Sequence, residues 1–82
     1  MEQIARSPKQ IGAAIRRHRR SMRVSQVTLG IKAGLRQATI SALENGEPGI
    51  QLRTLIDAMT ALGLEMVIRE RTQASENIGS LF

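Results

Sequence analysis

Apolar residues recur at helical spacing in the first quarter of the chain. Ser7 and Pro8 mark a helix start, because serine can cap free backbone N–H groups and proline fits the first helical position. The apolar stripe that follows predicts a helix to about Met22 with one buried face. The members of this stripe are Ile11, Ala14, Ile15, His18 in its neutral form, and Met22.

The next stretch, residues 26–45, predicts two short helices joined by a tight turn. Ser25 is the expected N-cap of the first helix, and Gly34 supplies the left-handed backbone that ends it. Gly30 lets the second helix cross closely over the first. The helices are expected over 26–33 and about 37–45, with Leu35, Ile40 and Leu43 filling the angle between them.

A further helix is predicted to end at Gly63. It begins near residues 49–51, where no Ser, Thr or Asp cap fixes its first residue. Its predicted apolar stripe consists of Leu52, Leu55, Ile56, Met59 and Leu62.

Residues 64–71 change to a period of two, which predicts a β-strand, although a longer helix or an irregular segment is the alternative. A single strand leaves backbone groups unpaired, and the chain supplies no second strand. The same strand of a second copy would complete an antiparallel ribbon in a homodimer. The expected interface residues are Leu64, Met66, Val67 and Ile68.

The chain therefore divides into a folded domain, 1–71, and a flexible tail, 72–82. The tail is polar until Leu81 and Phe82, and most such tails have no function. Phe82 is the only aromatic residue of the chain. Leu81 and Phe82 are therefore candidates for an anchor in a partner's pocket.

With 82 residues, the chain is near the lower size limit for a domain stabilised by its core alone, which favours dimerisation. The absence of cysteine excludes disulfides and thiolate metal sites. No run approaches the ~20 apolar residues that span a bilayer, so a cytoplasmic protein that acts on the nucleoid is expected, with no membrane partner.

The positive charge is concentrated in one half of the chain. Residues 1–36 contain nine Lys and Arg against one acidic residue, Glu2, whereas residues 37–82 contain three Arg and six acidic residues. The first part is thus +8 and the second −3. This asymmetry favours a polyanionic partner over a surface that is charged only for solubility.

The outward face of the helix at 37–45 has side chains suited to DNA bases. Arg can bind guanine O6 and N7, Gln can bind adenine N6 and N7, and an Ala methyl can contact thymine. The expected base-contacting residues are Arg36, Gln37, Ala38 and Ser41.

Phosphate contacts are expected around this helix and from the arginine run of the first helix, Arg16, Arg17, Arg19, Arg20 and Arg23, whose alternative role is solvation. The start of the helix at 26–33 can also hold a phosphate. The phosphate-contacting residues that we predict are Arg16, Arg17, Arg20, Ser25, Gln26, Thr39 and Asn45.

The stretch SQVTLGIKAGLRQATISALENG resembles the lambda-repressor-like, or xenobiotic-response-element, helix-turn-helix family over roughly residues 8–63. This resemblance implies a mainly α fold of four to five helices, which the strand predicted above would follow. Gly30 departs from the family, which more often has alanine there. We expect this glycine to weaken its helix by about 1 kcal/mol.

More narrowly, the stretch LRQATISALEN, with the later strand and tail, resembles the HipB antitoxins. In that family a dimer binds the operator DNA of its own operon and also binds HipA, a serine/threonine kinase toxin, which is thereby inactive. The resemblance implies double-stranded operator DNA, a second copy and a HipA-like kinase toxin as partners.

An enzyme is the least expected class. The chain has a single histidine, His18, no phosphate-binding glycine loop and no metal-ligand spacing, so no catalytic residue, cofactor or metal is expected. Two alternatives to an antitoxin stay open. One is a stand-alone or phage-type repressor, and the other is an adaptor whose helix-turn-helix no longer binds DNA.

Overall fold

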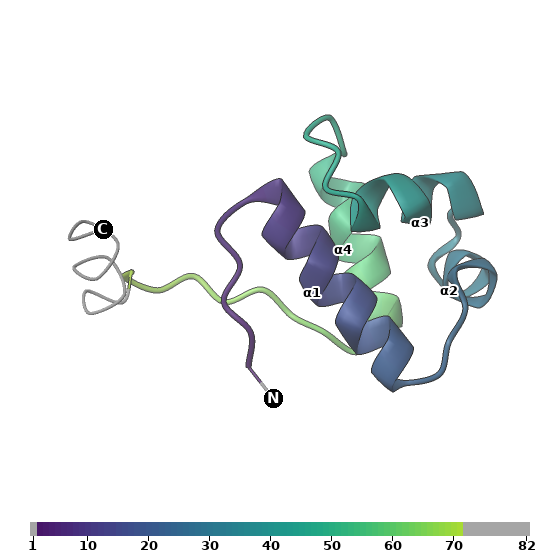
Figure 1. The fold of residues 1–82 in the computed structure, drawn as a ribbon, viewed down its shortest axis with the longest axis horizontal. Coiled ribbons are helices and arrows are strands. Elements are labelled where there is room, and N and C mark those ends of the chain that lie inside the picture. Colours follow the sequence, from purple (N-terminus) through teal and green to yellow (C-terminus); the bar gives the residue numbers. More distant parts are fainter. Residues whose placement is uncertain (1, 72–82) are drawn as a thin grey trace.

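The computed structural model describes residues 2–71, and four α-helices make up its folded body (Figure 1). α3 packs against both α1 and α2, and α2 also packs against α4. The mainly helical prediction is confirmed within these residues. The helices are α1 (Pro8–Ser21), α2 (Gln26–Ala33), α3 (Gln37–Glu44) and α4 (Leu52–Ala61).

The predicted helix starts are confirmed where a side chain caps them. The Ser7 hydroxyl accepts a hydrogen bond from the Gln10 backbone N–H at 3.1 Å, with Pro8 next in the chain. Ser25 caps α2 in the same way, by accepting from the Thr28 N–H at 3.0 Å. Both serines satisfy N–H groups that the first helical turn leaves unpaired.

A left-handed residue follows each of the four helices. Glycine occupies this position after α2, α3 and α4, but Arg23, with a φ of 58°, occupies it after α1. Two hydrogen bonds close this end, from Arg23 N–H to the Arg20 carbonyl and from Val24 N–H to the Arg19 carbonyl. This pairing is the Schellman motif, here formed without the usual glycine.

The core is aliphatic and lies where the four helices meet. The two most completely buried large side chains are Leu29 of α2 and Ile40 of α3. Burial of aliphatic side chains supplies the driving force for folding, since no aromatic ring occurs among residues 2–71. Within residues 2–71, the buried apolar core consists of Ile15, Leu29, Ile40, Leu43, Leu55, Ala58 and Leu62.

Three predicted core positions were wrong. Met22 lies after the end of α1 and is 45% exposed. In α4, Leu52 and Ile56 are 63% and 45% exposed, because the side that faces the core centres on Leu55 and Ala58. The sequence pattern identified the helix, but it assigned Leu52 and Ile56 to the buried side, where Ala58 lies instead.

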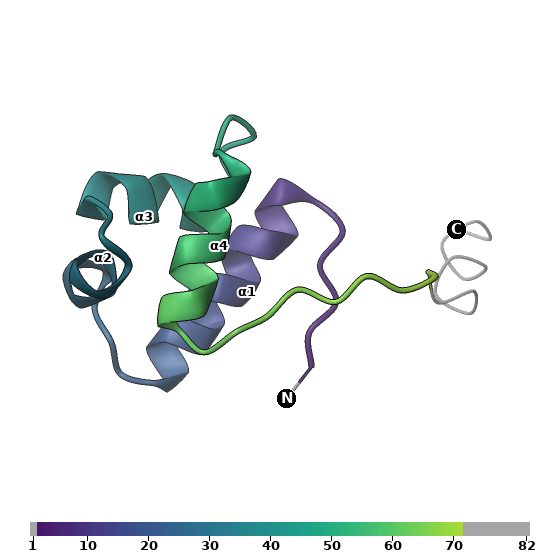
Figure 2. The ribbon, with the colours of Figure 1, turned by 180° about the vertical axis from the view of Figure 1, so that it is seen from behind.

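The predicted strand is not confirmed by this single chain. Residues 64–71 have no regular secondary structure and extend away from the helical body, passing the N-terminal segment (Figures 1 and 2). A ribbon across a two-fold axis needs a second copy, so its pairing stays a prediction. The predicted tail, with Leu81 and Phe82, lies outside the described residues. Among those described, no helix is long and apolar enough to cross a membrane.

Gly12 sets the distance between α1 and α3, and the sequence analysis missed it. A Cβ at this position would contact the Leu43 carbonyl oxygen and would lie 2.6 Å from the Glu44 carbonyl oxygen. These are backbone atoms, which cannot rotate away. α1 therefore crosses the end of α3 at a separation that only glycine allows.

We predict that Gly12→Ala destabilises the fold. Alanine is favoured over glycine in a helix by about 1 kcal/mol, but overpacking costs about 1–3 kcal/mol and a clash with backbone belongs at the upper end, so the net loss is about 2 kcal/mol. Urea unfolding followed by circular dichroism measures this difference. Gly49→Ala is the control, because nothing lies within 4 Å of its Cβ position. A Gly12→Ala variant as stable as the wild type would disprove the close crossing.

Candidate nucleic-acid interface

A buried ion pair joins the last turn of α1 to the last residue of α3. Arg19 Nε donates to Glu44 Oε2 at 2.6 Å, and Arg19 Nη2 donates to Glu44 Oε1 at 2.9 Å. The two side chains are only 9% and 1% exposed. Arg19 belongs to the arginine run of the first helix but not to the residues predicted to contact phosphate, and its guanidinium faces the protein interior.

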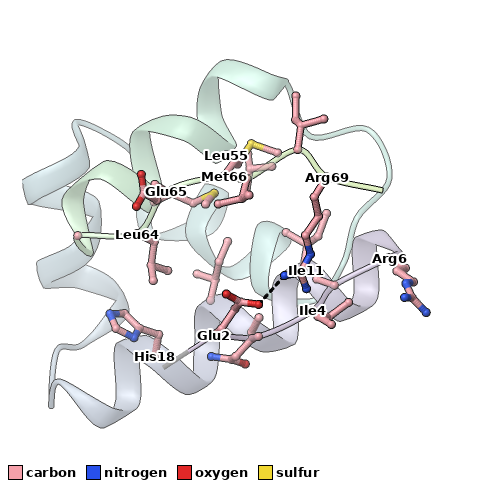
Figure 3. Close-up of a pocket in the computed structure, with 18 of the residues that line it drawn as sticks. Glu2, Ile4, Arg6, Ile11, His18, Leu55, Leu64, Glu65, Met66 and Arg69 are labelled. Carbon is pink, nitrogen blue, oxygen red and sulfur yellow. Dashed lines mark hydrogen bonds and ion pairs between the residues drawn. The ribbon is translucent and has the colours of Figure 1, made fainter. Parts of the chain in front are cut away.

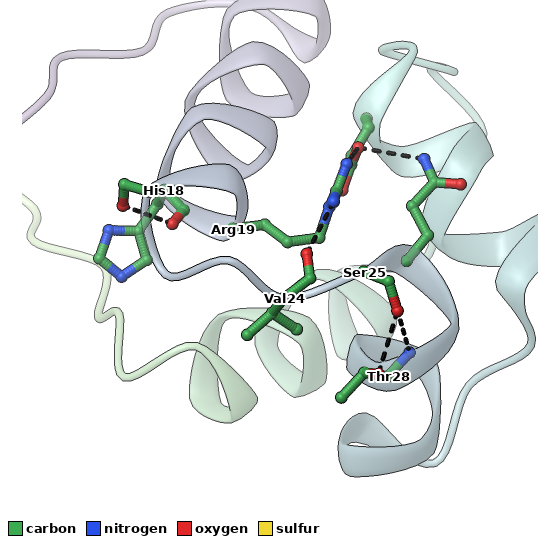
Figure 4. Close-up of polar contacts among 8 residues, drawn as sticks. His18, Arg19, Val24, Ser25 and Thr28 are labelled. Atoms are coloured by element: carbon green, nitrogen blue, oxygen red, sulfur yellow. Dashed lines mark hydrogen bonds and ion pairs between the residues drawn. The ribbon is translucent and has the colours of Figure 1, made fainter.

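The same pair also binds the turn and α2. Arg19 Nη1 donates to the Val24 carbonyl at 2.8 Å, and the side-chain amide of Gln26 donates to Glu44 Oε1 at 3.1 Å (Figure 4). One guanidinium and one carboxylate therefore connect α1, the turn after it, the first residue of α2 and the end of α3. Hydrogen bonds to charged groups are stronger than neutral ones, which makes this connection rigid.

Both members of the pair are held in their charged forms. Burial alone would raise the pKa of Glu44, but hydrogen bonds from Arg19 and Gln26, together with the arginine charge, lower it below its ordinary value. The hydrogen bond to Glu44 raises the pKa of Arg19, against the opposing effect of burial. At neutral pH the pair is ionised and adds no net charge to the surface around it.

α3 presents a polar face to solvent on the side opposite its buried residues. Ile40 and Leu43 are 0% and 4% exposed, whereas Gln37, Ala38 and Asn45 are exposed. Arg36, also exposed, precedes the helix and makes no side-chain cap. Ser41 and Thr39 are half-buried. Of the predicted base-contacting residues, three are exposed and one, Ser41, is half-buried.

The arginines of α1 point in different directions. Arg16 follows Gly12 by four residues, so it lies on the side of α1 where Gly12 meets α3, and its charge helps to lower the pKa of Glu44. Arg20, one turn further along, is rotated by about 80° from Gly12 around the helix axis. Arg17 faces elsewhere, because its Nε and Nη2 donate to Gln3 Oε1 at 3.0 and 2.7 Å. Arg16 therefore lies on the α3 side of α1, Arg17 binds the N-terminal segment, and Arg20 is exposed between these two directions.

The start of α2 offers backbone rather than side-chain groups. The Ser25 hydroxyl accepts from the Thr28 N–H and donates to Thr28 Oγ1 at 3.0 Å, and the Gln26 amide is bonded to Glu44. A phosphate at this position would meet the first N–H groups of α2 and the positive end of its dipole. The Ser25 and Gln26 side chains thus hold the helix start in place, and their contact with phosphate stays a prediction.

A family model described as a helix-turn-helix domain matches residues 10–72. The fold is also similar to the solved structure of a HipA-HipB-O2-O3 complex, with 31% identity over 87% of this chain and 100% of that chain and a TM-score of 0.81. The chain belongs to the HipB-like family of helix-turn-helix DNA-binding proteins. A HipB-O4 20mer complex gives the same values, and a HipB-O1-O2 complex gives 32% identity, 84% and 100% coverage and a TM-score of 0.79. No curated protein gives a significant match.

Within this HipB-like domain, the sequence analysis missed the residues that position α3 rather than those on its surface. Arg19 follows Ile15 by four residues, so it falls on the buried stripe of α1. A charged residue on such a stripe is a signal for an internal partner. The close approach of Gly46 to the start of α1 gave no comparable signal, and a Cβ there would lie 2.6 Å from the Lys9 Cα. Among residues 2–71, no group of His, Cys, Asp and Glu could hold a metal ion.

We predict that Arg19→Met destabilises the domain by about 3–5 kcal/mol, because it leaves the Glu44 carboxylate buried without its partner. The double variant Arg19→Met with Glu44→Leu should regain most of this loss, since it removes both charges. Urea unfolding of the wild type and the variants gives the coupling free energy.

Arg20→Met is the matched control, as its side chain is exposed in the same helical turn. We expect it to change the unfolding free energy by less than about 0.5 kcal/mol. If Arg19→Met and Arg20→Met lowered the free energy of unfolding equally, the role of the buried pair would be contradicted.

Proposed function

We propose that this chain is a dimeric, sequence-specific repressor and the antitoxin of a type II toxin–antitoxin pair. It binds palindromic operator DNA and neutralises a HipA-like serine/threonine kinase toxin in the cytoplasm, on the nucleoid. The observation behind this proposal is the exposed polar face of α3, fixed from behind by the Arg19–Glu44 pair, in a chain that aligns with the full length of HipB.

α3 is the proposed recognition helix. Arg36, Gln37 and Ala38 lie on or beside its exposed first turn, where side chains of this kind can bind base edges in the major groove. Ser41 follows one turn later. Arg16 and Arg20 of α1, Thr39 and Asn45 of α3, and the start of α2 with Ser25 and Gln26 contact the flanking phosphates. Arg17 joins them only if DNA binding releases it from Gln3.

The proposed dimer forms through residues 64–71. Met66, Val67 and Ile68 are 54%, 72% and 100% exposed, so this segment has little apolar contact within its own chain. Pairing with a second copy would cover these side chains and place two α3 helices on successive major grooves. Two recognition helices about one DNA turn apart match a palindromic site.

The proposed toxin partner is supported by the HipB structure solved together with HipA. Leu81 and Phe82 are the residues predicted to enter a pocket on the kinase. A stand-alone repressor would share the DNA site but bind no kinase. Co-purification with the product of an adjacent kinase-like reading frame separates the two functions, and failure to bind that product would favour the stand-alone repressor.

Substitutions in the two classes of DNA contact should have different effects. We predict that Gln37→Ala costs about 1–3 kcal/mol on the preferred site and relaxes preference at one or two base pairs. Arg20→Ala should weaken all sequences alike, because phosphates carry no sequence information. Selection of sites from random DNA, followed by fluorescence anisotropy, measures both effects.

Thr60→Ala is a suitable control, because Thr60 is exposed on α4 in its last turn. An unchanged site preference in Gln37→Ala would show that α3 is not the recognition helix in the proposed orientation. The absence of DNA binding by the wild type at about 50 mM salt, where phosphate contacts are strongest, would exclude the repressor function altogether.

A further inference from the structure

The N-terminal arm, which we define as residues 2–6, is anchored to the rest of the chain by side-chain hydrogen bonds although it has no regular structure. Two of its contacts are with α1, and one is with the segment after α4. The contacts are Gln3 Oε1 with Arg17 Nε and Nη2 at 3.0 and 2.7 Å, Arg6 N–H with Gln10 Oε1 at 2.6 Å, and Glu2 Oε1 with Arg69 Nη1 at 2.8 Å.

The arm and residues 64–71 are the two walls of an open groove of about 870 Å³. Figure 3 shows Glu2 and Arg69 meeting between the two walls, while Arg6 is directed away. Side chains of α1 and α4 form the apolar floor. The floor residues are Ile11, Ala14, Leu55 and Met59. We call this space the arm groove.

The apolar residues of the second wall extend beyond the core of their own chain. Leu64 is half-buried against the core, Met66 is 54% exposed and Ile68 is fully exposed. In an extended chain these alternate residues share one face. Their exposure therefore rises along a continuous apolar face, which needs a covering surface from outside the chain.

The charges around the arm groove favour a second copy of this chain as the occupant. Three acidic and three basic residues line it, so their formal charges cancel, whereas the whole chain carries +5. The groove therefore lacks the net positive charge that would oppose contact between two copies. DNA would gain no net attraction at this site. The lining charges are Glu2, Glu65, Glu70, Arg6, Arg69 and Arg71.

We propose that the N-terminal arm is part of the dimerisation surface, because the arm groove receives the exposed apolar residues 66–68 of a second copy. The two-fold axis makes the contact reciprocal, so each chain provides a groove and also the residues that enter the groove of its partner. This inference rests on the proposed dimer. It adds the N-terminal arm, residues 2–6, to the interface proposed for residues 64–71.

The test compares full-length chains by sedimentation equilibrium. Ile4→Asp places a charge on the arm at a residue that is 53% exposed and lines the groove, and we expect the dimer dissociation constant to rise at least tenfold. Gln3→Ala, which frees the arm from Arg17 without a change in the core, should weaken the dimer in the same direction. Ile31→Asp is the matched control, because Ile31 is 77% exposed on α2 and outside the groove.

Circular dichroism checks that each variant retains the wild-type helix content. If folded Ile4→Asp and Gln3→Ala both dimerise as tightly as the wild type, the arm has no part in the interface, and the proposed repressor dimer still stands. If Ile31→Asp weakens the dimer as much as Ile4→Asp does, the groove is not the contact surface. A wild-type chain that is monomeric at all concentrations would instead overturn the dimer itself.

Discussion

The internal ion pair between Arg19 and Glu44 is the constraint on which the DNA-facing surface depends. It fixes the end of α3 relative to α1 and, through Val24 and Gln26, the turn and the start of α2. Every proposed DNA contact belongs to one of these elements. A small shift in the pair would therefore move the base-contacting and phosphate-contacting groups relative to one another.

Such a pair is a costly way to stabilise a small domain, since removing two charges from water offsets much of their attraction. Its contribution is orientation, because a bidentate contact defines both distance and angle. Gly12 also fixes the position of α3, because it sets how closely α1 approaches that helix. The rigid body presents α3, while the two segments proposed for assembly, residues 64–71 and the arm, lie away from α3 (Figure 1).

Local signals were sufficient to predict the helices, and packing decided what the sequence could not show. Ser7, Ser25 and Gly34 act on adjacent backbone, so their roles were predictable. The partner of Arg19 and the exposure of Leu52 depend on how helices distant in sequence cross, which periodicity does not encode. The state of residues 64–71 depends on a second chain, and the DNA contacts depend on a ligand, so both stay predictions.

Hydroxyl-radical footprinting of the wild-type protein on a selected DNA site tests most directly whether a symmetric dimer binds DNA through α3. The account predicts two protected stretches on one face of the duplex, with centres about 10 base pairs apart, that appear together as protein concentration rises. A single protected stretch, or two that fill independently, would contradict it.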